Sequence, residues 1–179
     1  MTAVSEGGSG TPKDYFELFQ IEPQFDVDID DLGRRFRTLQ RRFHPDRYGS
    51  GSATDQRLAA QVSADINAGY QALKDPITRA GHLLERKDCD LRTLERQPVS
   101  NEFLMQQMRL RDAAESLDPS DTESRSKLAA QTQMLMQAEL LSFKEAIEKE
   151  DYELAGFAWV HLLYWQKLNQ EVAGSSDLL

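Results

Sequence analysis

The sequence is poor in the residues that build disulfides, strands and membrane spans. Its 179 residues include one cysteine, Cys89, which excludes an intramolecular disulfide and a cysteine-rich zinc or iron–sulfur site within the chain. Val and Ile together number 11, whereas Leu, Ala and Gln together number 53, a balance that favours helices over strands. No apolar run approaches the roughly 20 residues that a transmembrane helix needs. We therefore predict an all-α protein that does not cross a membrane.

Positive charge is also scarce. The chain has 21 Lys and Arg against 30 Asp and Glu, a net charge of −9, which opposes a dedicated nucleic-acid binder because such proteins present a basic surface. Residues 1–11 are small and polar, and the first arginine is Arg34, so the chain shows neither a signal peptide nor an Arg-rich presequence. We expect a disordered tail at 1–11 and a cytoplasmic protein.

Helical periodicity organises the first half of the chain. The apolar turn at 14–19 is too short to be stable alone, so it must pack on something longer. Two longer helices are predicted at 30–43 and 54–76, and they form an antiparallel pair around an intervening loop. The stripes expected to be buried are Leu32, Phe36, Leu39 and Phe43 in the first helix, and Leu58, Val62, Ile66, Gly69 or Tyr70, and Leu73 in the second.

The second half predicts a helical bundle. Residues 77–97 are interrupted and predict a connector with one short helix. Helices at about 100–117, 122–149 and 152–172 follow, and a three-helix bundle is the simplest way to bury their apolar faces. The stripe expected in the last helix is Leu154, Ala158, His161, Trp165, Leu168 and Val172. The predicted domains are therefore 12–76 and 98–179, and His161 is interpreted as a hydrogen-bonded core residue without a role in function.

The loop after the first long helix carries the trio His44-Pro45-Asp46. Pro45 fixes the loop, and it places an imidazole and a carboxylate at an exposed tip between two helices. The outer face of the preceding helix is basic, although the protein is acidic. The arginines that project from that face are Arg34, Arg37 and Arg41.

The helix predicted at 100–117 has apolar residues on two sides. One side holds Phe103, Leu110, Ala114 and Leu117, and the other holds Leu104, Met105 and Met108. The pattern alone allows both sides to be buried in the bundle or the second side to be exposed. Flexible methionines suit an adaptable protein-binding surface.

These features together resemble a known family of co-chaperones. Residues 14–19 are similar to the first helix of a J-domain, and residues 42–47 are similar to the end of its second helix and the following loop. The motifs that narrow the resemblance to the HscB type, the J-protein of iron–sulfur cluster assembly, are Ile66-Asn67-x-Gly69-Tyr70-x-x-Leu73-x-x-Pro76, Arg79-Ala80-x-x-Leu83-Leu84 and Phe103-Leu104-Met105. The similarity extends from about residue 14 to about residue 172.

The resemblance implies an L-shaped protein, with a J-domain on one arm and a three-helix bundle on the other. It implies that His44, Pro45 and Asp46 engage an HscA/DnaK-like chaperone and promote its ATP hydrolysis. The arginines expected to help the protein dock on the acidic surface of that chaperone are Arg34, Arg37, Arg41, Arg42 and Arg47.

The resemblance also implies an IscU-type scaffold as the second partner. The family counterparts of Leu104, Met105, Met108 and Tyr164 form the apolar patch that binds this scaffold. Family members often carry several glutamates around the patch, where this chain has Arg109, Asp112 and Ser116, so Asp112 is the acidic residue expected there. The implied activity is delivery of the scaffold to the chaperone, with no cofactor and no covalent step by the chain itself.

Two other functions remain open at the level of the sequence. A general J-domain co-chaperone for protein folding would bind many unfolded chains at residues 104–108 rather than one scaffold. A helical enzyme using His44 and Asp46 would show turnover without a partner, but an exposed loop offers no pocket to desolvate these groups. Cys89 has acidic neighbours and no second thiol, so its thiolate is not favoured and we assign it no role.

Overall fold

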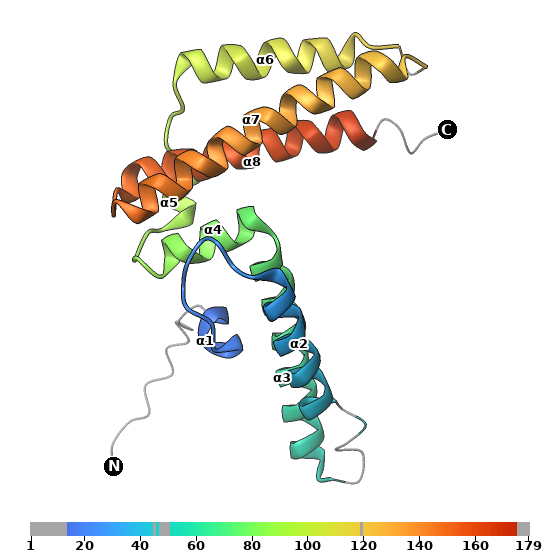
Figure 1. The fold of residues 1–179 in the computed structure, drawn as a ribbon, viewed down its shortest axis with the longest axis vertical. Helices are drawn as coiled ribbons and strands as arrows, with labels where there is room; N and C mark the ends of the chain where they lie inside the picture. The colour runs from blue at the N-terminus through green and yellow to red at the C-terminus, as the bar shows by residue number, and fades with distance from the viewer. Residues whose placement is uncertain (1–13, 45, 47–50, 119, 175–179) are drawn as a thin grey trace, which may run out of the picture. The chain divides into compact units, whose positions relative to one another are not determined.

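The computed structural model describes residues 14–44, 46, 51–118 and 120–174, and within these ranges the regular structure is helical without any strand (Figure 1). The chain divides into two units, Met1–Asp75 and Pro76–Leu179. The helices are α1 (Tyr15–Phe19), α2 (Ile29–Phe43), α3 (Ala53–Lys74), α4 (Pro76–Glu85), α5 (Leu91–Glu95), α6 (Asn101–Glu115), α7 (Thr122–Glu148) and α8 (Tyr152–Gly174). The all-α class is thereby confirmed, and none of the helices in the described ranges is long and apolar enough to cross a membrane.

In the first unit, α2 and α3 lie side by side with their caps encoded locally. The Asp28 carboxylate accepts hydrogen bonds from the backbone N–H groups of Asp30 and Asp31, both at 2.9 Å, which starts α2. A capping box starts α3, since Ser52 Oγ accepts from Asp55 N and Asp55 Oδ2 accepts from Ser52 N. The fully buried side chains between the helices are Phe16, Phe19, Leu32, Ile66 and Leu73.

The five-residue helix α1 is held by one arginine of α2 as well as by its buried rings. Arg35 Nη1 donates hydrogen bonds to the backbone oxygens of Phe19, at 3.1 Å, and Gln20, at 2.7 Å. These carbonyls end α1 and have no partner within so short a helix. Arg35 Nε in turn donates to Asp31 Oδ2 at 2.6 Å, so the Asp31 carboxylate fixes the guanidinium that fastens α1.

We expect Asp31→Asn to weaken the first unit at neutral pH and to lose that effect in acid. The hydrogen bond from Arg35, joined by one from Arg34, holds the pKa of the Asp31 carboxyl below its ordinary value. The stability that the carboxylate contributes is therefore complete above the ordinary aspartate pKa and is lost as pH falls through the lowered value. Urea midpoints measured from neutral pH to below about pH 3 should converge for wild type and variant. Asp30→Asn, in the same turn of α2, is the control, and a gap that persists in acid would contradict the assignment.

Close packing of α1 on α3 depends on Gly69. A Cβ atom at this position would lie 2.7 Å from Tyr15 Cδ1 and 3.1 Å from Phe19 Cε2. These are ring atoms of α1, so Gly69→Ala must push the short helix away, at a destabilisation of about 1–3 kcal/mol. The control is Gly33→Ala in α2, where the Cβ atom meets only the end of Arg37 at 3.4 Å and should stabilise by about 0.5–1 kcal/mol.

Urea unfolding followed by far-ultraviolet circular dichroism measures both glycine variants. The two tryptophans, Trp159 and Trp165, both lie in α8, so their emission reports the second unit and serves as the internal reference. If Gly69→Ala and Gly33→Ala shifted the circular dichroism midpoint alike, the close approach of α1 to α3 would not be the limiting contact.

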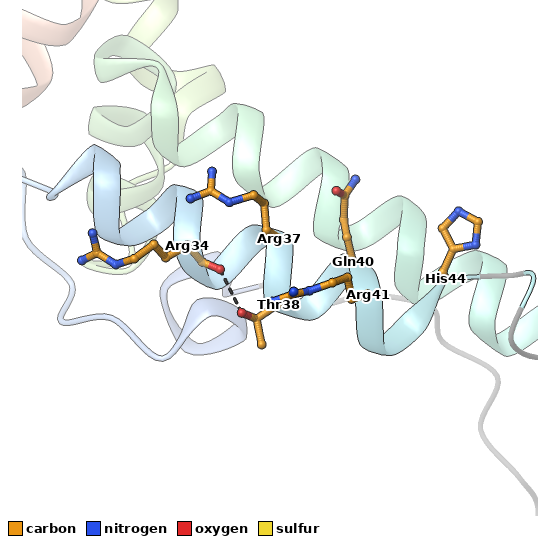
Figure 2. Close-up of a pocket in the computed structure, with 6 residues that line it drawn as sticks. All are labelled: Arg34, Arg37, Thr38, Gln40, Arg41 and His44. Atoms are coloured by element: carbon orange, nitrogen blue, oxygen red, sulfur yellow. Dashed lines mark hydrogen bonds between the residues drawn. The ribbon is translucent and has the colours of Figure 1, made fainter.

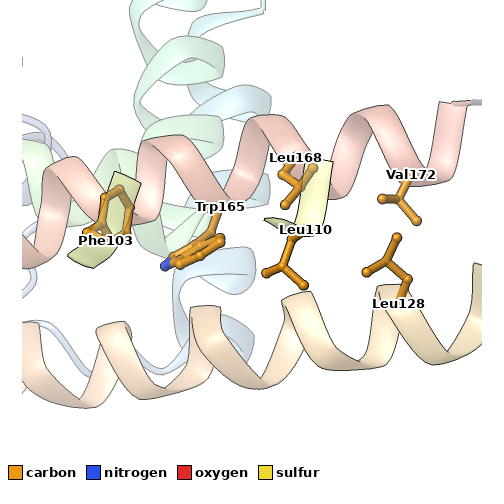
Figure 3. Packing of buried hydrophobic residues seen from close by; sticks show 6 residues of the cluster. All are labelled: Phe103, Leu110, Leu128, Trp165, Leu168 and Val172. Atoms are coloured by element: carbon orange, nitrogen blue, oxygen red, sulfur yellow. The ribbon is translucent and has the colours of Figure 1, made fainter. Parts of the chain in front are cut away.

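The second unit is built on the hairpin of α7 and α8, which run antiparallel along most of their length (Figure 1). The reversal uses Glu150 in a left-handed conformation, with φ 58°, and Asp151, whose side chain accepts from Leu154 N and caps α8. Helix α6 lies against this hairpin, and Figure 3 shows the shared core. Its buried members are Phe103, Leu110, Leu128, Trp165, Leu168 and Val172.

The segment predicted as a connector at 77–97 differs from that expectation, because it holds two helices, α4 and α5, and both pack on α8. Trp159 Nε1 donates a buried hydrogen bond of 3.1 Å to the backbone oxygen of Ile77. The side chains of Ile77, Leu83 and Leu84 are buried as well. Helix α8 is therefore covered from a second side, and the second unit extends beyond three helices.

Two leucines predicted to be buried are exposed. Leu58 has an exposed fraction of 63%, and the buried residue at that level of α3 is its neighbour Ala59. Leu58 stands about 80° around the helix from Ile66, whereas Ala59 stands about 20° from it, so helix geometry selects the smaller side chain. Leu154 is 47% exposed in the first turn of α8, where the side chain of its neighbour Ala155 is fully buried instead.

Candidate functional site

The outer side of α2 carries the predicted basic face. Arg34, Arg37, Arg41 and Arg42 project from this helix, and all four are exposed. Figure 2 shows that Arg34, Arg37, Arg41 and His44 follow one another along the helix, where they line an open hollow with Thr38 and Gln40. The face is set in place by the α2–α3 contacts behind it, including the stacked rings of Phe36 and Tyr70, 4.1 Å apart, and a hydrogen bond of 3.1 Å from Gln40 to Asn67.

At the end of this face, His44 follows the last residue of α2. Its imidazole is 57% exposed, and Nδ1 accepts a 3.3 Å hydrogen bond from the backbone N–H of Asp46. In that arrangement the neutral ring carries its proton on Nε2, which remains available as an outward donor. The Asp46 carboxylate is 89% exposed and lies 3.5 Å from the same Nδ1. Pro45 and Arg47 lie outside the described residues.

A second surface lies on α6, in the other unit. The exposed fractions are 38% for Leu104, 52% for Met105 and 59% for Met108, while Phe103 and Leu110 of the same helix are buried. The structure thus decides between the two interpretations of this helix in favour of an exposed apolar side. Asp112 is exposed one turn beyond Met108 on that side.

Phe103 connects this side of α6 to Tyr164, which is 40% exposed on α8. The Phe103 ring meets the Tyr164 ring edge-on, with centroids 5.6 Å apart, and stacks on the His161 ring at 3.8 Å. His161 Nδ1 lies 3.0 Å from Glu139 Oε1 of α7, so the histidine is fixed by a hydrogen bond within the bundle. We call Leu104, Met105, Met108 and Tyr164 the apolar patch.

Several residues that support these surfaces escaped the sequence analysis. The Arg35 contacts with α1 and the ion pair of Arg111 Nε with Glu171 Oε2, 3.4 Å apart across α6 and α8, join residues far apart in the chain, which periodicity cannot reveal. Burial, together with the charge of Asp88, raises the pKa of the Cys89 thiol, in keeping with its lack of an assigned role. Within the described ranges, no three His, Cys, Asp or Glu side chains gather in a way that could hold a metal ion.

Comparison with known proteins adds an independent line of observation. Residues 99–173 match a family model described as the HSCB C-terminal oligomerisation domain. A co-chaperone protein HscB homolog from Photobacterium profundum is 38% identical over 160 residues, covering 88% of this chain and 94% of that protein. A homolog of the same name from Neisseria meningitidis is 35% identical over 162 residues, covering 90% and 98%.

Solved structures show the same similarity. The chaperone HscB from Vibrio cholerae matches with a TM-score of 0.81 at 31% sequence identity, covering 92% of this chain and 98% of that one. The human co-chaperone protein HscB matches with a TM-score of 0.88 at 21% identity, covering 94% and 84%. The similarity to the Vibrio cholerae protein is one of fold and sequence together, whereas the similarity to the human protein is one of fold.

Proposed function

Because this chain belongs to the HscB family of co-chaperones, we propose that it stimulates the ATPase of an HscA/DnaK-like chaperone and delivers an IscU-type scaffold to it during iron–sulfur cluster biogenesis. The observation that carries the proposal is the exposure of two chemically different surfaces on two units. One is a basic helix face that ends in His44 and Asp46, and the other is the apolar patch.

The basic face suits an acidic partner. The protein has a net charge of −9, so a row of arginines attracts an acidic chaperone surface to this one face. Such electrostatic steering raises the association rate and weakens as the salt concentration increases. Once docked, the Nε2–H of His44 and the Asp46 carboxylate offer a donor and an acceptor at the tip of the helix pair. Pro45 and Arg47 complete the chaperone-binding set in this proposal.

The apolar patch suits a folded protein partner. Two methionines adapt their shape to a partner surface, while Leu104 and the Tyr164 ring, braced by Phe103, form its firmer part. Asp112 at the edge of the patch adds a carboxylate that can pair with a basic group of the scaffold. In this proposal the protein works by holding scaffold and chaperone together in the cytoplasm, which raises the effective concentration of one for the other, and it carries out no covalent step itself.

Steady-state ATP hydrolysis by the HscA-type chaperone tests the proposal, measured with and without the IscU-type scaffold and with added wild-type protein. Stimulation by the protein, with a further increase when the scaffold is present, is the expected result. Stimulation that ignores the scaffold would support a general J-domain co-chaperone with another client. No stimulation at all would overturn the proposal.

A further inference from the structure

Two side chains of the apolar patch carry chemistry that binding a protein partner does not require. Met105 and Met108 each bring a thioether sulfur to the surface, whereas Leu104 brings only hydrocarbon. A leucine offers a partner about as much apolar surface as a methionine does, but only the methionine is converted to a polar group by a mild oxidant. The patch therefore holds two oxidisable groups where the proposed function needs apolar contact.

Both methionines are open to small solutes. Their exposed fractions are 52% and 59%, and their spacing of three residues places them side by side on α6. The same helix is held to the α7–α8 hairpin by Phe103 and Leu110, which are buried. An oxidant can therefore reach Met105 and Met108 without any opening of the core.

The single thiol of the chain competes poorly for the same oxidant. Cys89 is half-buried, and this burial, together with the charge of Asp88, raises the pKa of its thiol. The thiolate is the form that reacts with peroxides, so a thiol that stays protonated reacts slowly. Within the described ranges, the sulfur atoms best placed to react are those of exposed methionines.

Helix α7 supplies a control of the same chemistry. Its two methionines are Met136, which is half-buried, and Met134, which is 73% exposed. Met134 is thus more exposed than either methionine of the apolar patch, but it belongs to neither of the two proposed binding surfaces. An oxidant that reaches the patch reaches Met134 as well, and the two positions can be compared in one sample.

We propose that Met105 and Met108 are a reversible oxidation site, at which hydrogen peroxide releases the scaffold from the apolar patch. At each residue a sulfur lone pair attacks one oxygen of hydrogen peroxide, so that the S–O bond forms and the O–O bond breaks. The departing hydroxide takes up the proton of the transferred hydroxyl group and leaves as water. The sulfur is oxidised by two electrons and the peroxide is reduced by two.

The product is a polar side chain in an apolar contact. A sulfoxide oxygen accepts hydrogen bonds from water, and a partner surface shaped for a thioether would remove that water without replacing it. Because both side chains face solvent in the free protein, oxidation weakens binding and leaves the fold intact. Methionine sulfoxide reductases return the sulfoxide to the thioether, so the change is reversible. This inference rests on the proposed scaffold binding and adds its regulation.

Peroxide treatment of the full-length chain, with removal of the peroxide before the scaffold is added, tests the proposal. Titration calorimetry should show that oxidation raises the dissociation constant for the IscU-type scaffold by about tenfold or more. Treatment with the two classes of methionine sulfoxide reductase, one for each epimer, should restore it. Mass spectrometry locates the added oxygen, because trypsin releases the patch methionines in peptide 97–109 and the α7 methionines in peptide 128–144.

Two leucine variants assign the effect to its position. The double variant Met105→Leu and Met108→Leu has no sulfur in the patch, so its scaffold affinity after peroxide should equal its own affinity before. Met134→Leu is the matched control, and it should lose as much affinity on oxidation as wild type does. Oxidised wild type should also keep its basal stimulation of the chaperone, because the basic face of α2 contains no methionine.

Oxidised wild type that binds the scaffold as tightly as the untreated protein would overturn the proposal. So would a double leucine variant that loses affinity as wild type does, or patch methionines that stay unmodified while Met134 is oxidised. Untreated wild type that does not bind the scaffold would instead overturn the proposed function, and this inference with it. Failure that appears only after oxidation therefore concerns the inference alone.

Discussion

His44→Gln is expected to reduce the chaperone ATPase to its rate without the co-chaperone. The reason is local, because the imidazole is 57% exposed and its Nδ1 is engaged by the backbone of Asp46, which aims the opposite ring nitrogen outward. Glutamine has no imidazole ring, and its side chain is not held in this orientation by the backbone of Asp46. Steady-state ATP hydrolysis by the chaperone, measured up to saturating concentrations of the variant, distinguishes lost stimulation from weakened binding. We expect stimulation to be absent at every concentration of the variant.

The matched control is His82→Gln in the second unit. His82 Nδ1 lies 3.1 Å from Glu85 Oε2, so this change also removes a histidine with an acidic neighbour but leaves the α2 tip untouched. It should stimulate as wild type does. Full stimulation by His44→Gln would remove this residue from the mechanism, and unchanged circular dichroism of both variants would show that folding is not the cause.

The triple variant Leu104→Ala, Met105→Ala and Met108→Ala is expected to keep basal stimulation and to lose the increment that the scaffold adds. Each of these side chains is at least 38% exposed, so truncation leaves no cavity in the core. Apolar anchors at the centre of an interface contribute about 1 kcal/mol or more each, so scaffold affinity should fall by on the order of 100-fold. Titration calorimetry with the scaffold measures this loss directly.

Leu154→Ala provides the control for the apolar patch. Leu154 is an exposed apolar side chain of the same unit, at the start of α8, and its truncation should leave scaffold affinity unchanged. If the triple variant and this control bound alike, the scaffold would have to use a different surface.

The parts of the fold that could be predicted are those determined by neighbours in the sequence. The starts of α2, α3 and α6 follow from Asp28, Ser52 and Ser100, because a capping side chain acts within three residues. The basic face could be predicted because its arginines lie on the side of α2 opposite the apolar residues of that helix. The apolar residues on two sides of α6 made an exposed patch one of two possibilities. Only the positions of α7 and α8 show which side of α6 is buried.

The parts that escaped prediction depend on contacts between distant segments. Hydropathy prefers Leu58 to its neighbour Ala59, although Ala59 stands closer to Ile66 around α3, and it is the alanine that the structure buries. The second cover of α8 depends on Trp159 reaching Ile77, a contact across 82 positions. In the same way, nothing near Arg35 in the sequence indicates that it fastens α1.

The contact of α1 with Gly69 has a consequence for the order of folding. A five-residue helix cannot persist by itself, and its two buried rings find their place only against α2 and α3. The ribosome makes α1 first, yet its docking surface is complete only after Gly69 has been added. Docking of the segment that opens the first unit must therefore wait for the synthesis of α3, and it requires closure of the stretch of chain that brings Tyr15 and Phe19 to Gly69.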